Sequence, residues 1–416
     1  MMIVPMMLRL PAGLVLLGIF LAACGGTLPG SGGAGMAAPP PRPEAVDPAL
    51  TQATDQFGID LLRTVHTGRP EQNLFLSPVS AQVILSLAAN GARGQTQQEM
   101  LAALGYGETD LATVNQAIRD LRGIMAHPGD KVELSTANGI WYQKGLTVAP
   151  DFLTIATQQY GAQVSETTFG DPAAAAAINR WVSEQTGGRI PQLVDRTSAD
   201  DRMWLVNALY FKGAWQKLFD PNRTHPQPFY LPHGGTVEVP FMNQTATFGY
   251  LRDTGLTGVR LPYGEGGLAL YAFMPDEWEG FVEGLTPDRY AGWIAAMGER
   301  EIRLSMPKVK LTDQAELSEP LNAMGMRQAF VPGLADLGGL FTDGPELYVS
   351  RVIQKTFLEL NEEGTEAAAA TGVGVTATSA RPDPPPAVLL DRPFLLAIRD
   401  DRTGVTLFLG AIVNPQ

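Results

Sequence analysis

Glu362-Glu363-Gly364-Thr365-Glu366-Ala367-Ala368-Ala369-Ala370-Thr371 is the stretch from which the fold of this chain is inferred. It follows a strand-like apolar run at residues 352–360 and precedes a second apolar run at residues 394–398. More than twenty consecutive residues between the two runs, from 361 to 387, contain no bulky apolar anchor. In compact domains such a segment is usually a functional loop, a lid or a linker.

Alternation within this segment allows a third interpretation beside a short exposed helix and a solvated spacer. The Glu-Ala-Ala-Ala-Ala run has high helix propensity, and the Pro-rich end at residues 384–386 is typical of a stiff spacer. Alternate residues, however, form one uncharged set that can enter a protein interior, because side chains along a strand point to opposite faces. That set is Thr365, Ala367, Ala369, Thr371, Val373, Val375 and Ala377.

Residues 362–371 resemble, almost letter for letter, the hinge of the reactive-centre loop in inhibitory serpins. The resemblance covers nearly the whole chain after residue 50 and implies an α+β serpin fold. That fold would have three β-sheets, about nine helices and a long exposed reactive-centre loop at about residues 362–387. In that family a protease cleaves the loop, which then inserts into the main sheet and traps the acyl-linked protease. The implied hinge residues are Glu362, Gly364, Thr365, Glu366, Ala367, Ala368, Ala369, Ala370 and Thr371.

Further matches imply residues that control the opening of the main sheet. Ser77 before Pro78 is a typical helix start, and the residues up to Thr96 resemble the buried serpin helix. The resemblance implies a shutter, which is the region where the main sheet parts, and a breach, which is the region where insertion begins. The simpler explanations are helix capping for the two serines and core packing for the tryptophan. The implied residues are Ser77, Ser80, Asn207 and Gln354 in the shutter and Trp215 in the breach.

Gln354 departs from the family pattern, because the family usually has a histidine at this shutter position. A glutamine amide both donates and accepts hydrogen bonds, so it can replace the histidine without its sensitivity to pH. The sequence leaves open whether the exchange makes sheet opening faster or slower.

The N-terminus has the form of a bacterial export signal. Residues 1–23 contain one charge and an apolar run too short to span a bilayer. The sequence Leu-Ala-Ala-Cys-Gly around Cys24 resembles the lipobox, which implies cleavage before Cys24 and attachment of lipid to it; the alternative is an ordinary signal that leaves a free thiol. Residues 24–48 are predicted to be a flexible Gly/Pro-rich tether to a serpin domain at residues 49–416. We therefore expect an exported protein, either lipid-anchored to the cell envelope or secreted.

Composition and missing motifs exclude several classes of function. The net charge is −13 and no run of basic residues is present, so we expect no nucleic-acid partner. The four histidines lack HExxH spacing, and Cys24 is the single cysteine. No GxSxG elbow or phosphate-binding loop occurs. We expect no catalytic residues, no metal, no cofactor and a monomer.

The family numbering from the hinge places the reactive bond between Thr378 and Ser379, whereas counting back from residues 392–394 places it about four residues later. Arg381 precedes Pro382, which obstructs most serine proteases. Small residues around Thr378 favour an elastase- or subtilisin-like partner.

The sequence thus predicts a suicide-substrate inhibitor of serine endopeptidases. The alternative is a non-inhibitory serpin, a chaperone or binding module, and the absence of charge from the inward set favours inhibition.

Overall fold

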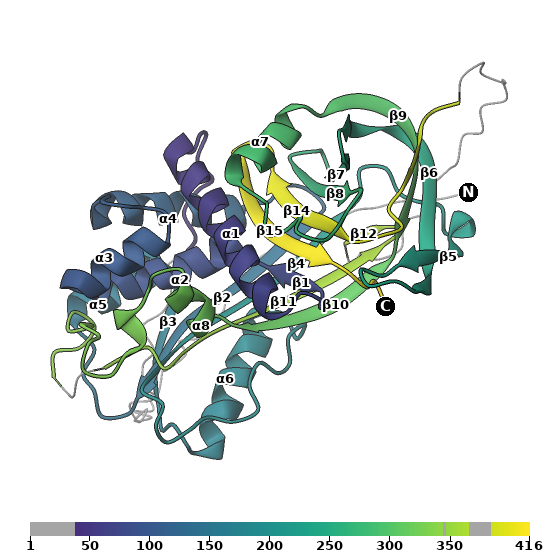
Figure 1. Ribbon diagram of the computed structural model, residues 1–416. Helices are drawn as coiled ribbons and strands as arrows, with labels where there is room; N and C mark the ends of the chain where they lie inside the picture. Colours follow the sequence, from purple (N-terminus) through teal and green to yellow (C-terminus); the bar gives the residue numbers. More distant parts are fainter. Residues whose placement is uncertain (1–37, 344–346, 366–383) are drawn as a thin grey trace, which may run out of the picture. The chain divides into compact units, whose positions relative to one another are not determined.

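The computed structural model describes residues 38–343, 347–365 and 384–416. These residues form eight α-helices and fifteen strands, so the α+β class is confirmed (Figure 1). The bounds of the helices are α1 Pro48–Gly68, α2 Pro78–Gly91, α3 Gly94–Ala103, α4 Leu111–Ala126, α5 Pro150–Thr154, α6 Pro172–Gln185, α7 Pro287–Ala295 and α8 Ser318–Ala323. Five of these eight helices, α1, α2, α4, α6 and α7, begin where a short polar side chain accepts a backbone N–H; Ser77, for example, accepts from the Ser80 amide.

The larger sheet has nine strands, in the order β1-β15-β14-β8-β7-β6-β9-β13, with β5 also paired to β6. Hydrogen bonds join the described strands into two sheets rather than the expected three. The reason is β6, which pairs with β9 over residues 241–250 and with β7 over residues 249–253. The bounds are β1 Leu74–Leu76, β5 His225–Tyr230, β6 Thr236–Asp253, β7 Leu256–Tyr263, β8 Leu268–Pro275, β9 Gly298–Pro307, β13 Ala387–Leu389, β14 Phe394–Asp400 and β15 Val405–Ile412.

The smaller sheet positions the candidate site. Its strands β11 and β4 pair directly in parallel, from Arg351 opposite Trp204 to Phe357 opposite Tyr210. Beyond that pairing the short strand β12 lies between them. The sheet is therefore closed along most of the β4–β11 junction and parted at one end. The order is β10-β11-β12-β4-β2-β3, with bounds β10 Val309–Glu316, β11 Arg351–Asn361, β12 Gly364–Thr365, β4 Met203–Ala214, β2 Val132–Gln143 and β3 Gln163–Thr167.

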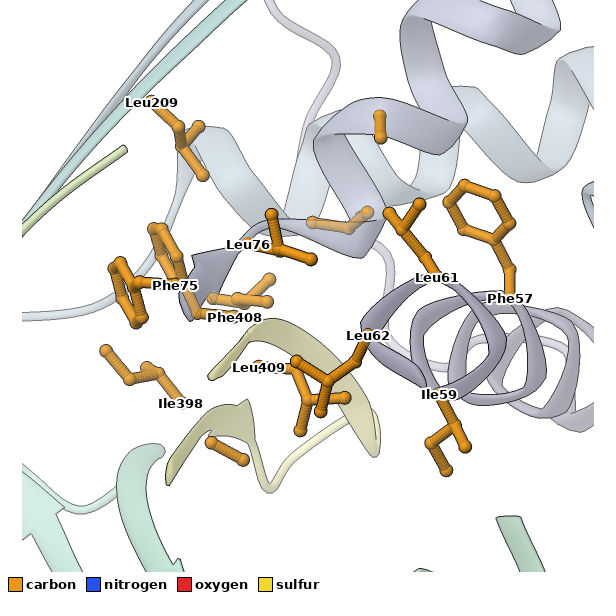
Figure 2. Packing of buried hydrophobic residues seen from close by; sticks show 14 of the residues in the cluster. Phe57, Ile59, Leu61, Leu62, Phe75, Leu76, Leu209, Ile398, Phe408 and Leu409 are labelled. Atoms are coloured by element: carbon orange, nitrogen blue, oxygen red, sulfur yellow. The ribbon is translucent and has the colours of Figure 1, made fainter. Parts of the chain in front are cut away.

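The main hydrophobic core lies where α1, α2 and the two sheets meet. Phe75 of β1 stacks on Phe408 of β15 with ring centroids 4.8 Å apart, and Leu209 of β4 belongs to the same buried cluster (Figure 2). Phe57 and Leu61 of α1 are almost completely buried in it. Burial of a large apolar side chain contributes about 1.5–3 kcal/mol, so this cluster holds the shutter helix α2 against the sheet.

The end of the predicted tether lies against the domain. Residues 38–47 form no helix or strand, but Arg42 pairs with the fully buried carboxylate of Asp400 and donates to the His127 carbonyl oxygen at 2.8 Å. Arg402 also donates to Asp400. The signal segment and the tether up to residue 37 lie outside the described residues. No helix within the described residues is long and apolar enough to cross a bilayer.

Asp55 of α1 predicts a measurable pH dependence of stability. Its Oδ1 is buried without a hydrogen-bond partner, and burial raises the pKa of the carboxyl to about 6 in spite of Thr406 and Arg399, which lower it. The folded state therefore binds a proton that the unfolded state has lost between about pH 4 and pH 6, so the wild type loses stability as the pH rises through this window. Asp55→Asn should remove that loss.

Relative to wild type, Asp55→Asn is expected to gain about 2–3 kcal/mol of unfolding free energy on going from about pH 4.5 to 7.5. Urea unfolding at both pH values measures the change. The exposed Asp288→Asn is the control, with the same loss of charge. A difference between Asp55→Asn and wild type that is equal at both pH values would contradict the prediction.

Candidate functional site

The beginning of the predicted hinge is already inserted at the parted end of the β4–β11 junction. Thr365 in β12 lies opposite Gly213 of β4 on one side and Leu360 of β11 on the other. Its side chain is completely buried, and its hydroxyl oxygen lies 2.6 Å from that of Tyr263. The first residue of the uncharged set thus points into the protein.

Gly364 is required by the close approach of β12 to β4. Its φ is +148°, which side-chain-bearing residues rarely adopt, and a Cβ here would lie 2.0 Å from the Gly213 carbonyl oxygen. Any other residue would push β12 away from β4. The glycine in the hinge pattern therefore has a steric explanation.

Glu362 holds the chain just before the hinge. Its carboxylate accepts hydrogen bonds from Lys308 Nζ and Thr224 Oγ1, each at 2.8 Å. Burial raises the pKa of this carboxyl, but the hydrogen bonds and the Lys308 charge outweigh burial, and the pKa lies below its usual value. Glu362 therefore stays ionised and clamped at neutral pH.

Trp215, the predicted breach residue, contacts the turn that leads into β12. Its ring stacks on Tyr263 with centroids 4.6 Å apart, and its Nε1 donates to the Asn361 carbonyl oxygen at 2.9 Å. The Trp215 amide donates to the Glu363 carbonyl oxygen at 2.8 Å. Trp215 thus holds the turn that leads into β12 by both its ring and its backbone.

Tyr263 is a site residue to which the sequence assigned no role. Burial raises the pKa of its hydroxyl, so the group stays protonated and able to donate to Thr365. Its partners Thr365 and Trp215 are distant in the sequence, and no local pattern around Tyr263 indicates that the three meet. Only the register of the two sheets brings them together.

The shutter residues form one hydrogen-bonded network centred on Gln354. The Gln354 Oε1 accepts from the Ser77 amide at 2.9 Å, and its Nε2 donates to the Ser77 carbonyl oxygen at 3.0 Å and to Asn207 Oδ1 at 2.8 Å. The Ser77 hydroxyl donates to the Leu407 carbonyl oxygen at 2.8 Å. One buried amide thus connects α2, β4 and β11.

Asn207 extends the network into β2. Its Nδ2 donates to Ser80 Oγ and, at 2.7 Å, to Asn138 Oδ1. Asn138 is a second site residue that the sequence did not single out, since it was interpreted only as the start of a strand. The side chains of Ser77, Ser80, Asn138, Asn207 and Gln354 have no group that titrates near neutral pH, so no protonation step near that pH alters the bonds between them.

The C-terminal stem of the predicted loop is also anchored. Arg303 of β9 donates from its backbone amide to the Pro386 carbonyl oxygen at 2.9 Å and from Nε to the Pro385 carbonyl oxygen at 3.1 Å. The chain then continues as β13, parallel to β9. The described residues on both sides of the predicted loop are therefore anchored, Thr365 before it and Pro385 after it.

The structure brings Ser77, Ser80, Asn207 and Gln354 together and places Trp215 beside Glu362, Gly364 and Thr365. Six residues of β4 separate Asn207 from Gly213, a distance of about 20 Å in a strand. The shutter and the hinge therefore occupy two positions along one junction. The remaining predicted site residues lie outside the described residues, and these are Cys24, Glu366, Ala367, Ala368, Ala369, Ala370, Thr371, Thr378 and Ser379.

Gln354→His should introduce a pH dependence that the wild-type network lacks. A neutral imidazole keeps one donor and one acceptor, whereas an imidazolium has no acceptor for the Ser77 amide and buries a charge. Burial lowers the pKa of such a histidine below its unfolded value of about 6.5, so its stabilising contribution is complete above that pH and is lost as the pH falls.

The expected loss for Gln354→His is about 1–2 kcal/mol of unfolding free energy between about pH 7.5 and 5, beyond the change in wild type. Urea unfolding at both pH values measures it, with the exposed Gln52→His as the control. The prediction is wrong if Gln354→His and Gln52→His change in parallel with pH.

Comparison with known proteins finds one family that matches most of the chain. The family model described as "Serpin (serine protease inhibitor)" matches residues 52–415. Bovine (Bos taurus) leukocyte elastase inhibitor is 32% identical over 88% of this chain and 99% of its own length, and a serpin-like protein of Thermococcus kodakarensis is 33% identical over 90% and 87%.

Two solved structures superpose on most of the chain. The thermophilic serpin tengpin in its native state has a TM-score of 0.82 and 30% identity, covering 89% of this chain and 95% of its own. Human thyroxine-binding globulin with its ligand has a TM-score of 0.82 and 28% identity, covering 88% and 98%. The serpin fold predicted from the hinge and shutter residues is confirmed, and the chain belongs to the serpin family.

Proposed function

We propose that this serpin is a suicide-substrate inhibitor of serine endopeptidases rather than an enzyme, with Thr378–Ser379 as its reactive bond. The observation that carries the proposal is the position of Thr365, buried between β4 and β11 at the end of a closed junction. A loop cleaved beyond this point can continue as a strand, because its first residue already has partners on both sides.

The register of β12 supports an extended insertion. With Thr365 opposite Gly213 and Leu360, a strand continuing in the same register would place Thr371 opposite Asn207 and Gln354 at once. These two residues now face each other across the β4–β11 pair. The register would end near residue 374, opposite Trp204 and Arg351, where the β4–β11 pairing begins.

Insertion has a local cost that the loop itself can offset. Parting β4 from β11 breaks the Gln354–Asn207 hydrogen bond, and an unpaired buried polar group costs about 1–3 kcal/mol. Thr371 belongs to the same alternate set as Thr365, so its hydroxyl would point inward and reach these side chains. The inserted strand would also add backbone hydrogen bonds along both neighbours.

Named relatives support the class of partner. The matching family model carries the description of a serine protease inhibitor, and a relative that covers most of the chain is called a leukocyte elastase inhibitor. Together with the small residues around Thr378, these names favour an elastase- or subtilisin-like target. The alternative, a non-inhibitory binding module, draws support from the relative that was solved with thyroxine.

Thr365→Arg should convert the inhibitor into a substrate. An arginine side chain does not fit the fully buried site against Tyr263, so insertion should stall at its first step while cleavage continues. Wild type and variant are incubated with trypsin-, chymotrypsin-, elastase- and subtilisin-like proteases. A detergent-stable covalent complex is expected with wild type, and a loss of about tenfold or more in complex yield is expected with the variant.

Thr365→Ser, which keeps the hydroxyl, and Thr254→Arg in the β6–β7 turn are the matched controls, and both should retain inhibition. Mass spectrometry of the released fragment locates the cleaved bond. The wild type should also melt at a higher temperature after cleavage, since a new strand joins the sheet. Full inhibition by Thr365→Arg, or equal melting temperatures before and after cleavage of wild type, would rule out the insertion mechanism.

We also propose that the protein is exported and anchored through lipid on Cys24, which rests on the lipobox-like sequence alone. Radiolabelled palmitate fed to a bacterial host should label the wild type, and Cys24→Ser should abolish the label. A Ser31→Cys change placed in the Cys24→Ser background is the control for an adventitious thiol and should stay unlabelled. Equal labelling of wild type and Cys24→Ser would refute the anchor and leave the inhibitor proposal untouched.

A further inference from the structure

A hollow with a volume of about 330 Å³ lies beside the C-terminal stem of the loop. It is lined by β6, β9 and β13 and by Arg223, which lies just before β5; Figure 1 shows β5, β6 and β9 side by side. Arg303, which holds Pro385, forms one wall of the hollow, and Leu389 of β13 forms another. The surface beside the C-terminal stem of the loop is therefore concave.

The chemistry of the hollow is cationic. Its lining includes the guanidinium groups of Arg223 and Arg303 and no carboxylate. Arg223 is exposed, and no described residue pairs with its guanidinium group. The ammonium group of Lys217 is directed elsewhere, since its Nζ donates to the Thr247 carbonyl oxygen. The two arginines lie together in a chain whose net charge is −13.

An apolar side chain completes the surface. Leu389 is 37% exposed, and only Tyr230 and Leu334 are exposed to a similar or greater extent among the large apolar side chains of the described residues. Arginine is enriched in protein-binding surfaces and among the residues that dominate their binding energy, and the two arginines here lie beside an exposed leucine.

Chain length places the target protease over this hollow. Six residues separate Ser379 from Pro385, and a chain spans at most about 3.3–3.6 Å per residue, so the reactive bond lies within about 20 Å of Pro385. A protease domain of about 200 residues has a radius of gyration of about 16 Å. A protease engaged at the bond therefore lies close enough for part of its surface, beyond its active-site cleft, to reach the hollow.

We propose that the hollow around Arg223 and Arg303 is a docking site for an acidic patch on the target protease and helps to select which protease is inhibited fastest. This inference rests on the proposed inhibitory function. Opposite charges on two surfaces raise the rate of association and fix the orientation of encounter, and salt weakens both effects. The docking surface would thus act before cleavage and leave the later insertion unchanged.

Arg223→Glu tests the proposal, and Arg119→Glu on the exposed face of α4 is the matched control with the same change of charge. The probe is the protease of the panel that the wild type inhibits fastest. Arg223→Glu should lower the second-order association rate constant about tenfold at low salt, Arg119→Glu less than about twofold, and the difference should shrink at high salt. The stoichiometry of inhibition and the melting temperature should stay at wild-type values, because the Arg223 guanidinium group has no partner to lose among the described residues.

Equal rate constants for the two variants would overturn the docking site while leaving the inhibitor proposal intact. A slower rate for Arg223→Glu with a raised stoichiometry would also overturn it, because Arg223 would then affect insertion rather than encounter. If the wild type forms no covalent complex with any protease, the proposed function fails and the docking site fails with it.

Discussion

The direct pairing of β11 with β4 is the constraint on which the rest of the structure depends. Two parallel strands at the centre of a sheet share hydrogen bonds from Arg351 to Phe357, and at one end β12 keeps them apart. Gln354 and Asn207 close the junction in its middle. One seam therefore contains both a short strand that parts β4 from β11 and the side-chain hydrogen bonds that keep the two strands together.

Hydrogen bonds between uncharged groups, rather than ion pairs, hold the middle of this seam. The network runs from α2 through Gln354 and Asn207 to Asn138 and uses donors and acceptors of serine and amide side chains. Ionic contacts lie at its end, where Lys308 and Thr224 hold Glu362 beside the inserted hinge. The hydrogen-bonded side chains in the middle of the seam contain no group that titrates near neutral pH, so the bonds between them do not depend on the pH in that range.

Sequence patterns predicted much of this site, because several of its parts are local. Ser77 caps a helix through an amide three residues away, and the run at residues 203–215 is apolar enough to indicate a buried strand. The hinge was identified from the resemblance of residues 362–371 to inhibitory serpins, and its small alternating residues agree with that identification. Asn138 and Tyr263 were missed as site residues for the opposite reason, since their partners Asn207 and Thr365 belong to strands far away in the chain.

The sequence alone determined the family, the chemical character of the hinge and the absence of a charge from its inward set, because these follow from the order and type of neighbouring residues. Only the tertiary structure decided that Thr365 is already inserted, that β6 merges two expected sheets, and that Arg223 and Arg303 meet beside the loop stem. All three features depend on strand register and on contacts between distant segments. No short stretch of the chain specifies the register or these contacts.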